Sequence, residues 1–576
     1  MRVVATAGHV DHGKSSLVLA LTGTDPDRFA EEKRRGLTID LGFAHAVLPS
    51  GEGVSFIDVP GHIRFLRNML AGVGGIDACL FVVAATEGWK PQSEEHLRIL
   101  ELLGVRHGVI ALTKVDLVDD EWRDIATLDV LDHVAGTFLA NAAVIAVSAP
   151  TGGGLDDLRA ALDTLVAQTP PADDRARPRL WVDRVFAAKG SGTVVTGTLT
   201  GGALHVDDRV SVGSRHHEVR IRSIQSLGTS MQAIGAGNRV ALNLSGVEHT
   251  EVRRGDAIVH QRQWRPTTRF DATLRVLDRL DHEVSRRGAY AAYIGSGEFT
   301  VKLRVLGSQA IEPGTSGLVR LYLPEALALL PGDRFILRES GRNETVGGGE
   351  VLDIAPVLSA SKATPDRDVQ RVVRERGWIA ADELALLTGE QLEPTIGQWV
   401  VTPEAVDALR ESVSERVLAA GPLGFDVAAF DDRERAVLAT IADLAIDNGR
   451  VRQAEVHDPL ADHPFVASLL AAGYAPPDAT GVDKAELRLL VRSGRVVERD
   501  GVFFHPLTID AAAQLAARLL AAHPDGFTVA QFRDGTASTR KHALPLAAEL
   551  DARGVTRRRD DLRIGGPRLP VVGGTE

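Results

Sequence analysis

Residues 8–15 read G-H-V-D-H-G-K-S, which fits the pattern G-x-x-x-x-G-K-[S/T]. They follow the apolar run 3–7, so we expect a buried strand that leads into a glycine turn and then a helix. Such a turn points backbone N–H groups at phosphate oxygens, and the positive end of the helix strengthens the attraction. Lys14 would reach the outer phosphates, and the Ser15 hydroxyl would ligate Mg²⁺. The residues of this loop that we predict to contact a nucleotide are Gly8, Val10, Asp11, His12, Gly13, Lys14, Ser15 and Ser16.

A second motif indicates which base the nucleotide carries. Thr113, Lys114 and Asp116 follow the apolar run 109–112. The Asp116 carboxylate can accept from the N1–H and 2-amino groups of guanine, whereas adenine has an acceptor at N1 and no 2-amino group. Ser148 and Ala149 follow the run 144–147 and are suited to contact the guanine oxygen through a backbone N–H. The sequence therefore predicts a site for GTP and GDP.

Two further segments are suited to sense the terminal phosphate. Asp58 and Gly61 close the apolar run 54–57: Asp58 would hold Mg²⁺ through a water, and the Gly61 N–H would bond the γ-phosphate. Thr38, in the segment 35–40, can ligate Mg²⁺ only while that phosphate is present. His62 is the predicted catalytic residue, which would orient the attacking water.

A chain of 576 residues is expected to fold into several domains, and these must position the segments described above. Strands alternate with helical stretches up to residue 170, which predicts an α/β domain with a parallel sheet covered by helices on both faces. Short strands separated by glycines then predict two antiparallel β-barrels. Alanine- and leucine-rich helices with hairpin-like ends predict about four α+β winged-helix repeats. The expected boundaries are 1–170 for the GTP-binding domain, 178–262 and 266–355 for the barrels, and 362–576 for the winged helices.

Composition narrows the class of protein. Charged residues make up 25% and hydrophobic ones 44%, which is typical of globular proteins. The one cysteine, Cys79, lies in an apolar run, so no disulfide framework is expected. Without an apolar run of about 18 residues, we expect no membrane partner and a cytoplasmic protein. The net charge of −12 argues against indiscriminate binding to polyanions, so contacts with nucleic acid must come from local basic patches.

Together, the segments 8–15, 35–40, 58–62 and 113–116 resemble those of the translational GTPases related to elongation factor Tu. The segments 84–92 and 183–197 strengthen the resemblance. Elongation factor Tu has nothing similar to residues 362–576, whereas the selenocysteine-specific elongation factors combine the same domains with C-terminal winged helices. Segments 35–43 and 69–77 are also more similar to that family. One departure is Thr113, which stands where most of these GTPases carry asparagine.

The resemblance implies specific partners and a second site. In that family the first three domains carry selenocysteinyl-tRNA to the ribosome, and the last winged helices bind a hairpin in the messenger RNA. Asp183, Arg184 and Arg239 occupy positions that line the family's aminoacyl pocket. A selenol is largely deprotonated in the cytosol while serine is neutral, so a cationic pocket would favour the selenocysteinyl group.

The last module, residues 510–566, is predicted to be the RNA-binding winged helix. Between residues 536 and 563 it carries seven basic and four acidic residues, an excess of positive charge within an acidic chain. Basic groups at a helix start and on a wing suit the phosphates of an RNA stem. The predicted RNA contacts are Arg540, Lys541, Arg557, Arg558 and Arg559.

We therefore expect a monomeric GTPase, stimulated by the ribosome, that delivers selenocysteinyl-tRNA at UGA codons while tethered to the messenger hairpin. One alternative is a sulfate-activation GTPase, which would leave the four winged helices unexplained. Another is a nucleic-acid-binding regulator whose GTP site is only a switch, which would leave Arg184 and Arg239 unexplained.

Overall fold

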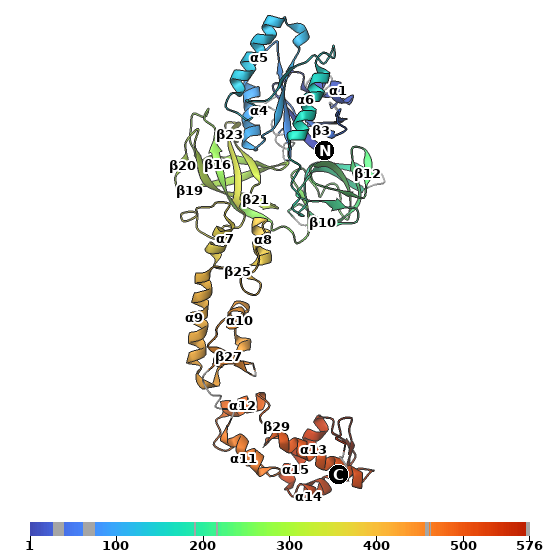
Figure 1. Cartoon of the computed structure of the whole chain (residues 1–576), viewed down its shortest axis with the longest axis vertical. Helices are drawn as coiled ribbons and strands as arrows, with labels where there is room; N and C mark the ends of the chain where they lie inside the picture. Colours follow the sequence, from blue (N-terminus) through green and yellow to red (C-terminus); the bar gives the residue numbers. More distant parts are fainter. Residues whose placement is uncertain are drawn as a thin grey trace. The chain divides into compact units, whose positions relative to one another are not determined.

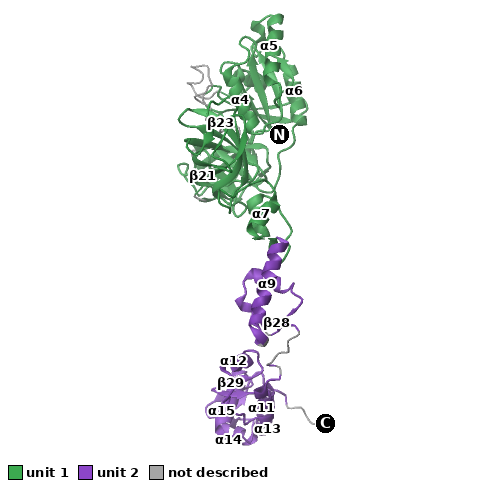
Figure 2. Cartoon of the chain, turned by 90° about the vertical axis from the view of Figure 1, so that its left-hand side faces the viewer, with its two compact units in different colours: residues 1–401 green, residues 402–576 purple. Residues whose placement is uncertain are grey.

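The computed structural model describes residues 1–26, 38, 40–61, 69, 75–188, 192–214, 217–447, 449–454, 460 and 462–571. The chain divides into two compact units, Met1–Val401 and Thr402–Glu576 (Figure 2). The first unit contains a sheet with helices, two barrels and one small helical module. The second unit contains further helical modules with short hairpins.

The first domain is drawn in blue to teal in Figure 1. It is built on a six-stranded sheet with strand order β2-β3-β1-β4-β5-β6. Its strands are β1 (Arg2–Ala7), β2 (Gly42–Val47), β3 (Gly53–Asp58), β4 (Ala78–Ala84), β5 (Gly108–Thr113) and β6 (Val144–Ala146). The helices are α1 (Lys14–Thr22), α4 (Pro91–Leu102), α5 (Asp120–Val134) and α6 (Leu155–Gln168), with the short 3-10 helix η2 (Val115–Leu117) after β5. Leucines and valines of α1 and α6 pack on one face of the sheet, and those of α4 and α5 pack on the other.

The five strands expected from the sequence are parallel, and a sixth strand that the sequence analysis did not identify joins one edge of the sheet. Strand β2 runs antiparallel to β3, while the other neighbouring strands are parallel. A tight turn joins the two strands, closed by the bond from the Leu48 N–H to the Glu52 carbonyl. So short a connection can join only antiparallel neighbours, because a parallel pair needs a long crossover.

Two β-barrels follow. In the first, the sheet order β10-β15-β7-β8-β14-β11-β12 closes through pairing of β10 with β11. Its strands are β7 (Arg179–Ala188), β8 (Gly192–Thr200), β9 (Leu204–His205), β10 (Arg209–Val212), β11 (His217–Ser226), β12 (Thr229–Met231), β13 (Ala233–Ile234), β14 (Asn238–Ser245) and β15 (Ala257–His260). Alternate residues of β11 and β14 are buried, as expected for strands with one face on a core.

The second barrel is a closed ring of β16-β21-β19-β18-β22-β23. Its strands are β16 (Thr267–Val276), β17 (Val284–Ser285), β18 (Tyr290–Ile294), β19 (Gly297–Leu306), β20 (Ala310–Ile311), β21 (Ser316–Leu327), β22 (Arg334–Glu339) and β23 (Glu344–Asp353). Phe270 and Phe335 meet edge to face in its core. The core continues into α4 of the first domain through Ile99 and Leu102.

A small helical module completes the first unit. It consists of α7 (Val369–Arg376), β24 (Trp378–Ala380), α8 (Ala381–Thr388) and β25 (Trp399–Val401). Valines and leucines of α7 and α8 share the core of the second barrel, and Arg371 pairs with Asp353 of β23 at 3.0 Å. The helical region of the chain therefore begins inside the first unit.

The second unit holds three more modules of helices and short strands. The first has α9 (Pro403–Ala419), η3 (Gly421–Leu423), β26 (Phe425–Asp426), η4 (Val427–Ala429), α10 (Asp432–Leu438), β27 (Leu444–Asp447) and β28 (Arg450–Gln453). The next has α11 (Pro464–Ala472), α12 (Lys484–Arg492), β29 (Val497–Arg499) and β30 (Val502–Phe504). The last has α13 (Pro506–Ala522), β31 (Phe527–Thr528), α14 (Val529–Gly535), α15 (Arg540–Ala552), β32 (Thr556–Arg559) and β33 (Leu562–Gly565).

The last module is a winged helix with its own core. The Phe527 and Phe532 rings stack on each other. Leu546 and Leu550 belong to the same core, and all four side chains are fully buried. The Thr528 hydroxyl accepts from the Gln531 N–H and forms a capping box that starts α14. Among the helices of the described ranges, none is long and apolar enough to cross a membrane.

Candidate functional site

The loop between β1 and α1 has the backbone of a phosphate cradle. Gly8, Asp11 and Gly13 have φ angles of 129°, 61° and 87°. A Cβ at Gly8 would collide with the Val82 carbonyl of β4, so only glycine fits there. A loop with such conformations can turn backbone N–H groups into one concavity, and α1 begins at Lys14 behind it. The Gly8 and Val10 N–H groups bond His96 Nδ1 and Gln92 Oε1 in this structure. The geometry is that of a phosphate site at a helix start.

Lys14 lies folded over this loop. Its ammonium donates to the Gly8 carbonyl at 3.1 Å and to the His9 carbonyl at 2.7 Å, and the residue is 6% exposed. Gly61 approaches from the other side, so closely that a Cβ there would lie 2.7 Å from the Val10 nitrogen. The predicted phosphate-sensing glycine and the phosphate loop are therefore brought together.

Three oxygen-bearing side chains meet beside Lys14. The Ser15 hydroxyl donates to Asp58 Oδ2 at 2.6 Å and lies 2.7 Å from the Thr38 hydroxyl. Asp58 is fixed from behind, because the Thr6 hydroxyl donates to its Oδ1 at 2.7 Å. Two hydroxyls and a carboxylate are the hard oxygen ligands that Mg²⁺ prefers. The residues predicted to hold the metal thus form one cluster that fits it chemically.

Two buried histidines support the loop, and the sequence motif includes only one of them. Burial lowers the pKa of His96 on α4 to about 3, and its Nδ1 accepts from the Gly8 N–H at 3.1 Å. Burial also lowers the pKa of His12 to about 4, and its ring is fully enclosed. Both rings are therefore neutral at physiological pH, and His12 is placed to serve a nucleotide through its backbone alone.

Thr113 does not act as a base-contacting side chain in this structure. It is 3% exposed, and its hydroxyl donates to the His12 carbonyl at 2.6 Å. It therefore ties the end of β5 to the phosphate loop. Lys114 follows with φ of 58°, a left-handed conformation, and its ammonium lies 3.3 Å from Glu87 Oε1.

The residues predicted to read guanine are placed at the ends of β5 and β6. Asp116 lies in η2 with an exposed side chain. Ser148 begins a tight turn in which its N–H donates to the Gly153 carbonyl and its own carbonyl accepts from the Gly152 N–H. Ala149 lies within that turn, immediately after the buried Ser148. The arrangement leaves the Asp116 carboxylate accessible to a base.

Asp183, Arg184 and Arg239 meet in the first barrel and contact the GTP-binding domain. Arg239 forms a bidentate ion pair with Asp183, with Nη1 2.5 Å from Oδ2 and Nη2 3.0 Å from Oδ1. Arg184 donates to the Leu41 carbonyl and pairs with Asp40 at 3.5 Å. Both guanidinium groups lie over the Phe43 ring, 3.3 Å (Arg239) and 4.6 Å (Arg184) from its centroid. The three predicted pocket residues are thus clustered around one aromatic side chain.

Beside this cluster lies a cavity of about 210 Å³ lined by residues of β2 and the first barrel. Phe43 and Arg239 contribute to its wall, together with Thr196 and Ser226. Phe43 is a site residue that motif reasoning missed. A clue was available, because an aromatic residue stands five positions after Thr38, at the start of β2.

The predicted RNA contacts all lie on the surface of the last module. Arg540 and Lys541 open α15, and Arg557, Arg558 and Arg559 occupy β32 with exposed side chains. Lys541 forms an ion pair with Asp478 at 2.8 Å. The positive end of α15 adds to the basic groups at its first turn.

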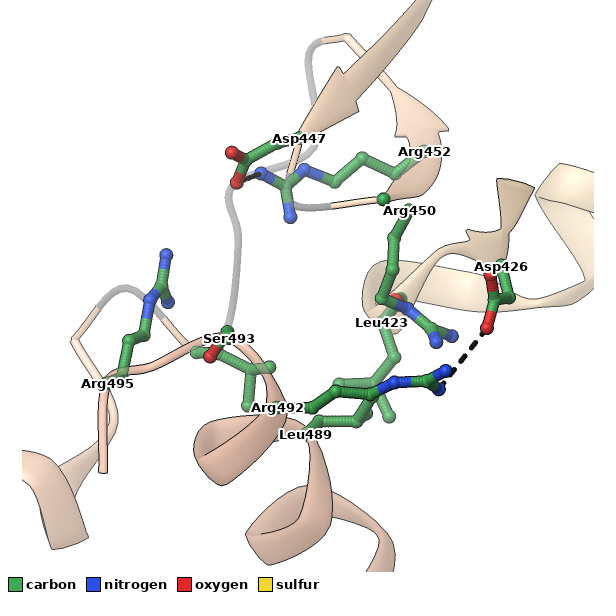
Figure 3. Close-up of a pocket in the computed structure, with 11 residues that line it drawn as sticks. Leu423, Asp426, Asp447, Arg450, Arg452, Leu489, Arg492, Ser493 and Arg495 are labelled. Atoms are coloured by element: carbon green, nitrogen blue, oxygen red, sulfur yellow. Dashed lines mark hydrogen bonds and ion pairs between the residues drawn. The ribbon is translucent and has the colours of Figure 1, made fainter. Parts of the chain in front are cut away.

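A second basic site lies in the same unit, and the sequence analysis did not single it out. Arg450, Arg452, Arg492 and Arg495 line a cavity of about 130 Å³ (Figure 3). Arg492 pairs with Asp426 at 3.3 Å and Arg452 with Asp447 at 3.1 Å. The four arginines of this cavity come from two different modules. Their spacing along the chain therefore does not predict that they lie together.

His62, the predicted catalytic residue, lies outside the described residues, as do residues 35–37. Its neighbours Asp58 and Gly61 are described and reach the phosphate loop.

Comparison with known proteins agrees with this architecture. Residues 1–168 match the family model of the elongation factor Tu GTP-binding domain, residues 273–357 that of the selenocysteine-specific elongation factor beta-barrel domain, and residues 518–564 that of the elongation factor SelB winged helix. A solved bacterial selenocysteine-specific elongation factor, EF-Sec, is 26% identical with a TM-score of 0.76, over 98% of this chain and 99% of that one.

Sequence relatives agree as well. The selenocysteine-specific elongation factor of Desulfomicrobium baculatum is 40% identical over 61% of this chain, and that of Escherichia coli is 34% identical over 69%. Elongation factor Tu 2 of Streptomyces avermitilis is 32% identical over 61% of this chain and 96% of its own length. This chain belongs to the selenocysteine-specific elongation factor family of elongation factor Tu-like GTPases.

Membership in the selenocysteine-specific elongation factor family confirms the resemblance and the predicted fold class, which combines a GTPase domain, two barrels and C-terminal winged helices. The sulfate-activation and regulatory alternatives find no support in these relatives. The matched regions span 55% and 65% of the length of the D. baculatum and E. coli factors.

Proposed function

We propose that the chain is a GTPase that delivers selenocysteinyl-tRNA to the ribosome at UGA codons while its last winged helix binds a hairpin of the messenger RNA. It would act as a monomer in the cytoplasm. The relatives that support this proposal carry the name selenocysteine-specific elongation factor.

The observation that carries the proposal is the continuity between the nucleotide site and the barrel pocket. Thr38 lies against Ser15 at the nucleotide site, and Asp40 and Phe43 lie against Arg184 and Arg239. Only a few residues separate the two ends of this segment. Loss of the γ-phosphate would free Thr38 and so shift the residues that cover the two arginines.

The charge of the pocket favours an anionic aminoacyl group. Two guanidinium groups face Phe43. Asp183 neutralises Arg239 in part. Asp40 is shared between Arg184 at 3.5 Å and Arg254 at 3.7 Å, which leaves an excess of one positive charge. A selenolate would form charge-assisted hydrogen bonds with these groups, which are about twice as strong as neutral ones. A serine hydroxyl can accept a hydrogen bond from the same cations but carries no negative charge of its own, so it lacks the ion-pair attraction. The pocket would therefore select selenocysteinyl-tRNA over seryl-tRNA.

The nucleotide site would determine when the tRNA is released, through GTP binding and hydrolysis. Ser15, Thr38 and Asp58 would hold Mg²⁺, which neutralises the charge of the phosphates when it is bound. Lys14 would bind the outer phosphates and Asp116 would select guanine. His62 would orient the attacking water once the ribosome positions it.

The decisive experiment measures the affinity of the full chain for one tRNA species charged with selenocysteine or with serine, in the presence of a non-hydrolysable GTP analogue and then of GDP. We expect binding that depends on the GTP analogue and favours the selenocysteinyl form. Equal affinity for the two aminoacyl forms would contradict the proposed pocket. Equal affinity with the two nucleotides would contradict the proposed switch.

A further inference from the structure

The hairpin between β22 and β23 carries an electrostatic feature that the proposed function does not use. Glu339, the last residue of β22, is paired directly with Glu344, the first residue of β23. Like charges directly opposite each other on antiparallel strands are destabilising. Arg342 supplies one positive charge near them, because its guanidinium lies 3.7 Å from Glu339 Oε2 and 4.0 Å from Glu344 Oε1.

His282, from the segment that links β16 to β17, reaches both of them. Its Nε2 lies 3.0 Å from Glu339 Oε2 and 3.8 Å from Glu344 Oε1. The three ligand atoms all lie within 4.8 Å of one another, and the side chains of His282 and Glu339 are 18% and 16% exposed. A metal bonded at roughly 2.0–2.2 Å places its ligands about 3–4.4 Å apart. The distances of 3.0 and 3.8 Å from Nε2 to the two carboxylates fall within this range.

The other ring nitrogen of His282 is also engaged. Asp281 Oδ1 lies 2.9 Å from Nδ1, the arrangement in which a carboxylate fixes the ring and directs Nε2 at a metal. Arg342 Nη1 lies 2.5 Å from the same Nδ1 and 3.0 Å from Asp281 Oδ1. In a metal-bound ring Nδ1–H donates to Asp281, so the Arg342 N–H would bond the Asp281 carboxylate and not Nδ1. Three carboxylates thus surround one guanidinium and one imidazole. With the imidazole neutral, two negative charges remain, which equals the charge of one divalent cation.

We propose that His282, Glu339 and Glu344 bind a divalent transition-metal ion of the Zn²⁺ class. Nitrogen and carboxylate ligands suit Zn²⁺ and its neighbours, whereas Mg²⁺ prefers oxygen ligands alone. The site differs from the Mg²⁺ cluster of Ser15, Thr38 and Asp58 in position and in ligand chemistry. The competing explanation is an ion-pair network in which His282 is protonated and no metal binds.

The position of the site suggests what the metal would stabilise. Arg338 and Thr345, the chain neighbours of the two glutamates, lie 3.5 and 3.1 Å from Glu95 of α4, and Arg279 lies 3.6 Å from it. Glu95 is a buried residue of the GTP-binding domain. The metal would tie the β22–β23 hairpin to the 277–283 segment and so hold together both halves of the surface that receives Glu95.

The test uses the full untagged chain, freed of metals by chelator dialysis and then saturated with Mg²⁺ and GDP so that the nucleotide site is filled. Co²⁺ is titrated by visible absorption, which reports its coordination, and Zn²⁺ is used to displace it. We expect one equivalent of Co²⁺ with a spectrum typical of low coordination number, loss of that spectrum in His282→Ala, and binding at least tenfold weaker in Glu344→Gln. Asp281→Asn should weaken binding about 10–100-fold, since it removes only the orienting carboxylate.

The matched control is His133→Ala, because His133 also faces a carboxylate, Asp129 at 3.3 Å, but lies outside the cluster. It should bind Co²⁺ as the parent chain does. Thermal unfolding in Zn²⁺ gives a second readout: the parent should gain stability and Glu344→Gln should not. An unchanged Co²⁺ spectrum in His282→Ala, or no binding by the parent chain, would overturn the proposal in favour of the ion-pair network.

Discussion

Arg239 and Asp183 form a bidentate ion pair in the first barrel, and both side chains are at most 14% exposed. The Thr196 hydroxyl donates to the same carboxylate at 2.7 Å, so Asp183 has a second partner. Asp183 thus fixes the guanidinium plane of Arg239 above Phe43. The pair explains how a positive charge is held at one position in the pocket rather than moving on a flexible side chain.

Replacement of Arg239 should therefore affect selectivity for the aminoacyl group. Arg239→Met removes the charge, while Thr196 still bonds Asp183 and should preserve folding. We expect the affinity for selenocysteinyl-tRNA to fall about 10–100-fold, as for removal of a hydrogen bond to a charged group, with little change for seryl-tRNA. Arg209→Met, at a side chain that is 79% exposed on β10, is the control. An unchanged ratio of the two affinities would contradict the role of Arg239.

Thr113 should matter for nucleotide affinity although its side chain does not face the base. Thr113→Val keeps the shape and leaves the His12 carbonyl without its 2.6 Å donor. An unpaired buried acceptor costs about 1–3 kcal/mol, so we expect GDP and GTP to bind roughly 5–150-fold more weakly. Nucleotide binding measured by titration calorimetry checks this, with Thr127→Val on α5 as a control outside the site. If nucleotide binding were weakened equally in the two variants, the proposed role of the hydrogen bond from Thr113 to the His12 carbonyl would be contradicted.

The buried histidines should make the GTP-binding domain sensitive to acid. Burial lowers the pKa of His96 to about 3 in the folded chain, whereas an unfolded histidine titrates near 6.5. Below pH 6.5 the unfolded state therefore binds more protons, and the free energy of unfolding falls as the pH drops from 6.5 toward 3. At pH 5 the decrease is about 2 kcal/mol for this group.

His96→Gln tests this, since a glutamine oxygen can still accept from the Gly8 N–H and does not titrate. We expect the decrease in opening free energy between pH 7 and pH 5 to be smaller in this variant by about 2 kcal/mol. Hydrogen exchange of the β1 and β4 amides reports that quantity locally. His45→Gln, at an exposed position on β2, should retain the parent's pH dependence. The same dependence in all three proteins would refute the role of His96.

The nucleotide site could be predicted from motifs because its parts are local in sequence. The glycines of the phosphate loop and the Lys14 and Ser15 side chains lie within eight residues, and their types dictate the backbone and the chemistry. Asp58 and Thr38 lie against Ser15, as expected of segments that must reach a shared metal. Each motif could be recognised locally, although Thr38 and Asp58 lie 23 and 43 positions from Ser15.

The remaining features depend on contacts between distant segments. The bond between Gly8 and His96 joins residues 88 positions apart, and that between Thr113 and His12 joins residues 101 apart. Nothing in the local sequence distinguishes His96 from an ordinary core histidine. The antiparallel β2 was missed because its pairing is set by a five-residue connection rather than by hydrophobic periodicity. The stacking of Phe43 under two arginines likewise requires two domains to meet.

His62→Ala should separate binding from catalysis. The sequence motif predicts His62 to orient the attacking water, and the described Gly61 before it packs against the phosphate loop. We expect GTP affinity to stay within about twofold and ribosome-stimulated hydrolysis to slow about 10²–10⁴-fold, the range for removal of a general acid–base or orienting group. Single-turnover hydrolysis on ribosomes measures this directly. Normal turnover in the variant would remove His62 from the catalytic role.

The basic strand β32 should contribute to RNA affinity through its arginines. Arg557, Arg558 and Arg559 are exposed on the wing, so their replacement should leave the core of the module intact. We expect Arg557→Ala and Arg559→Ala each to weaken binding of the messenger hairpin and to reduce the slope of log affinity against log salt by about 0.7–0.9 for each phosphate that the variant no longer neutralises. Arg533→Ala on α14 is the control, because Arg533 is already paired with Asp534 at 2.6 Å. If Arg533→Ala lowered the slope as much as the wing variants, the effect would reflect the net charge of the module rather than binding of phosphates at β32.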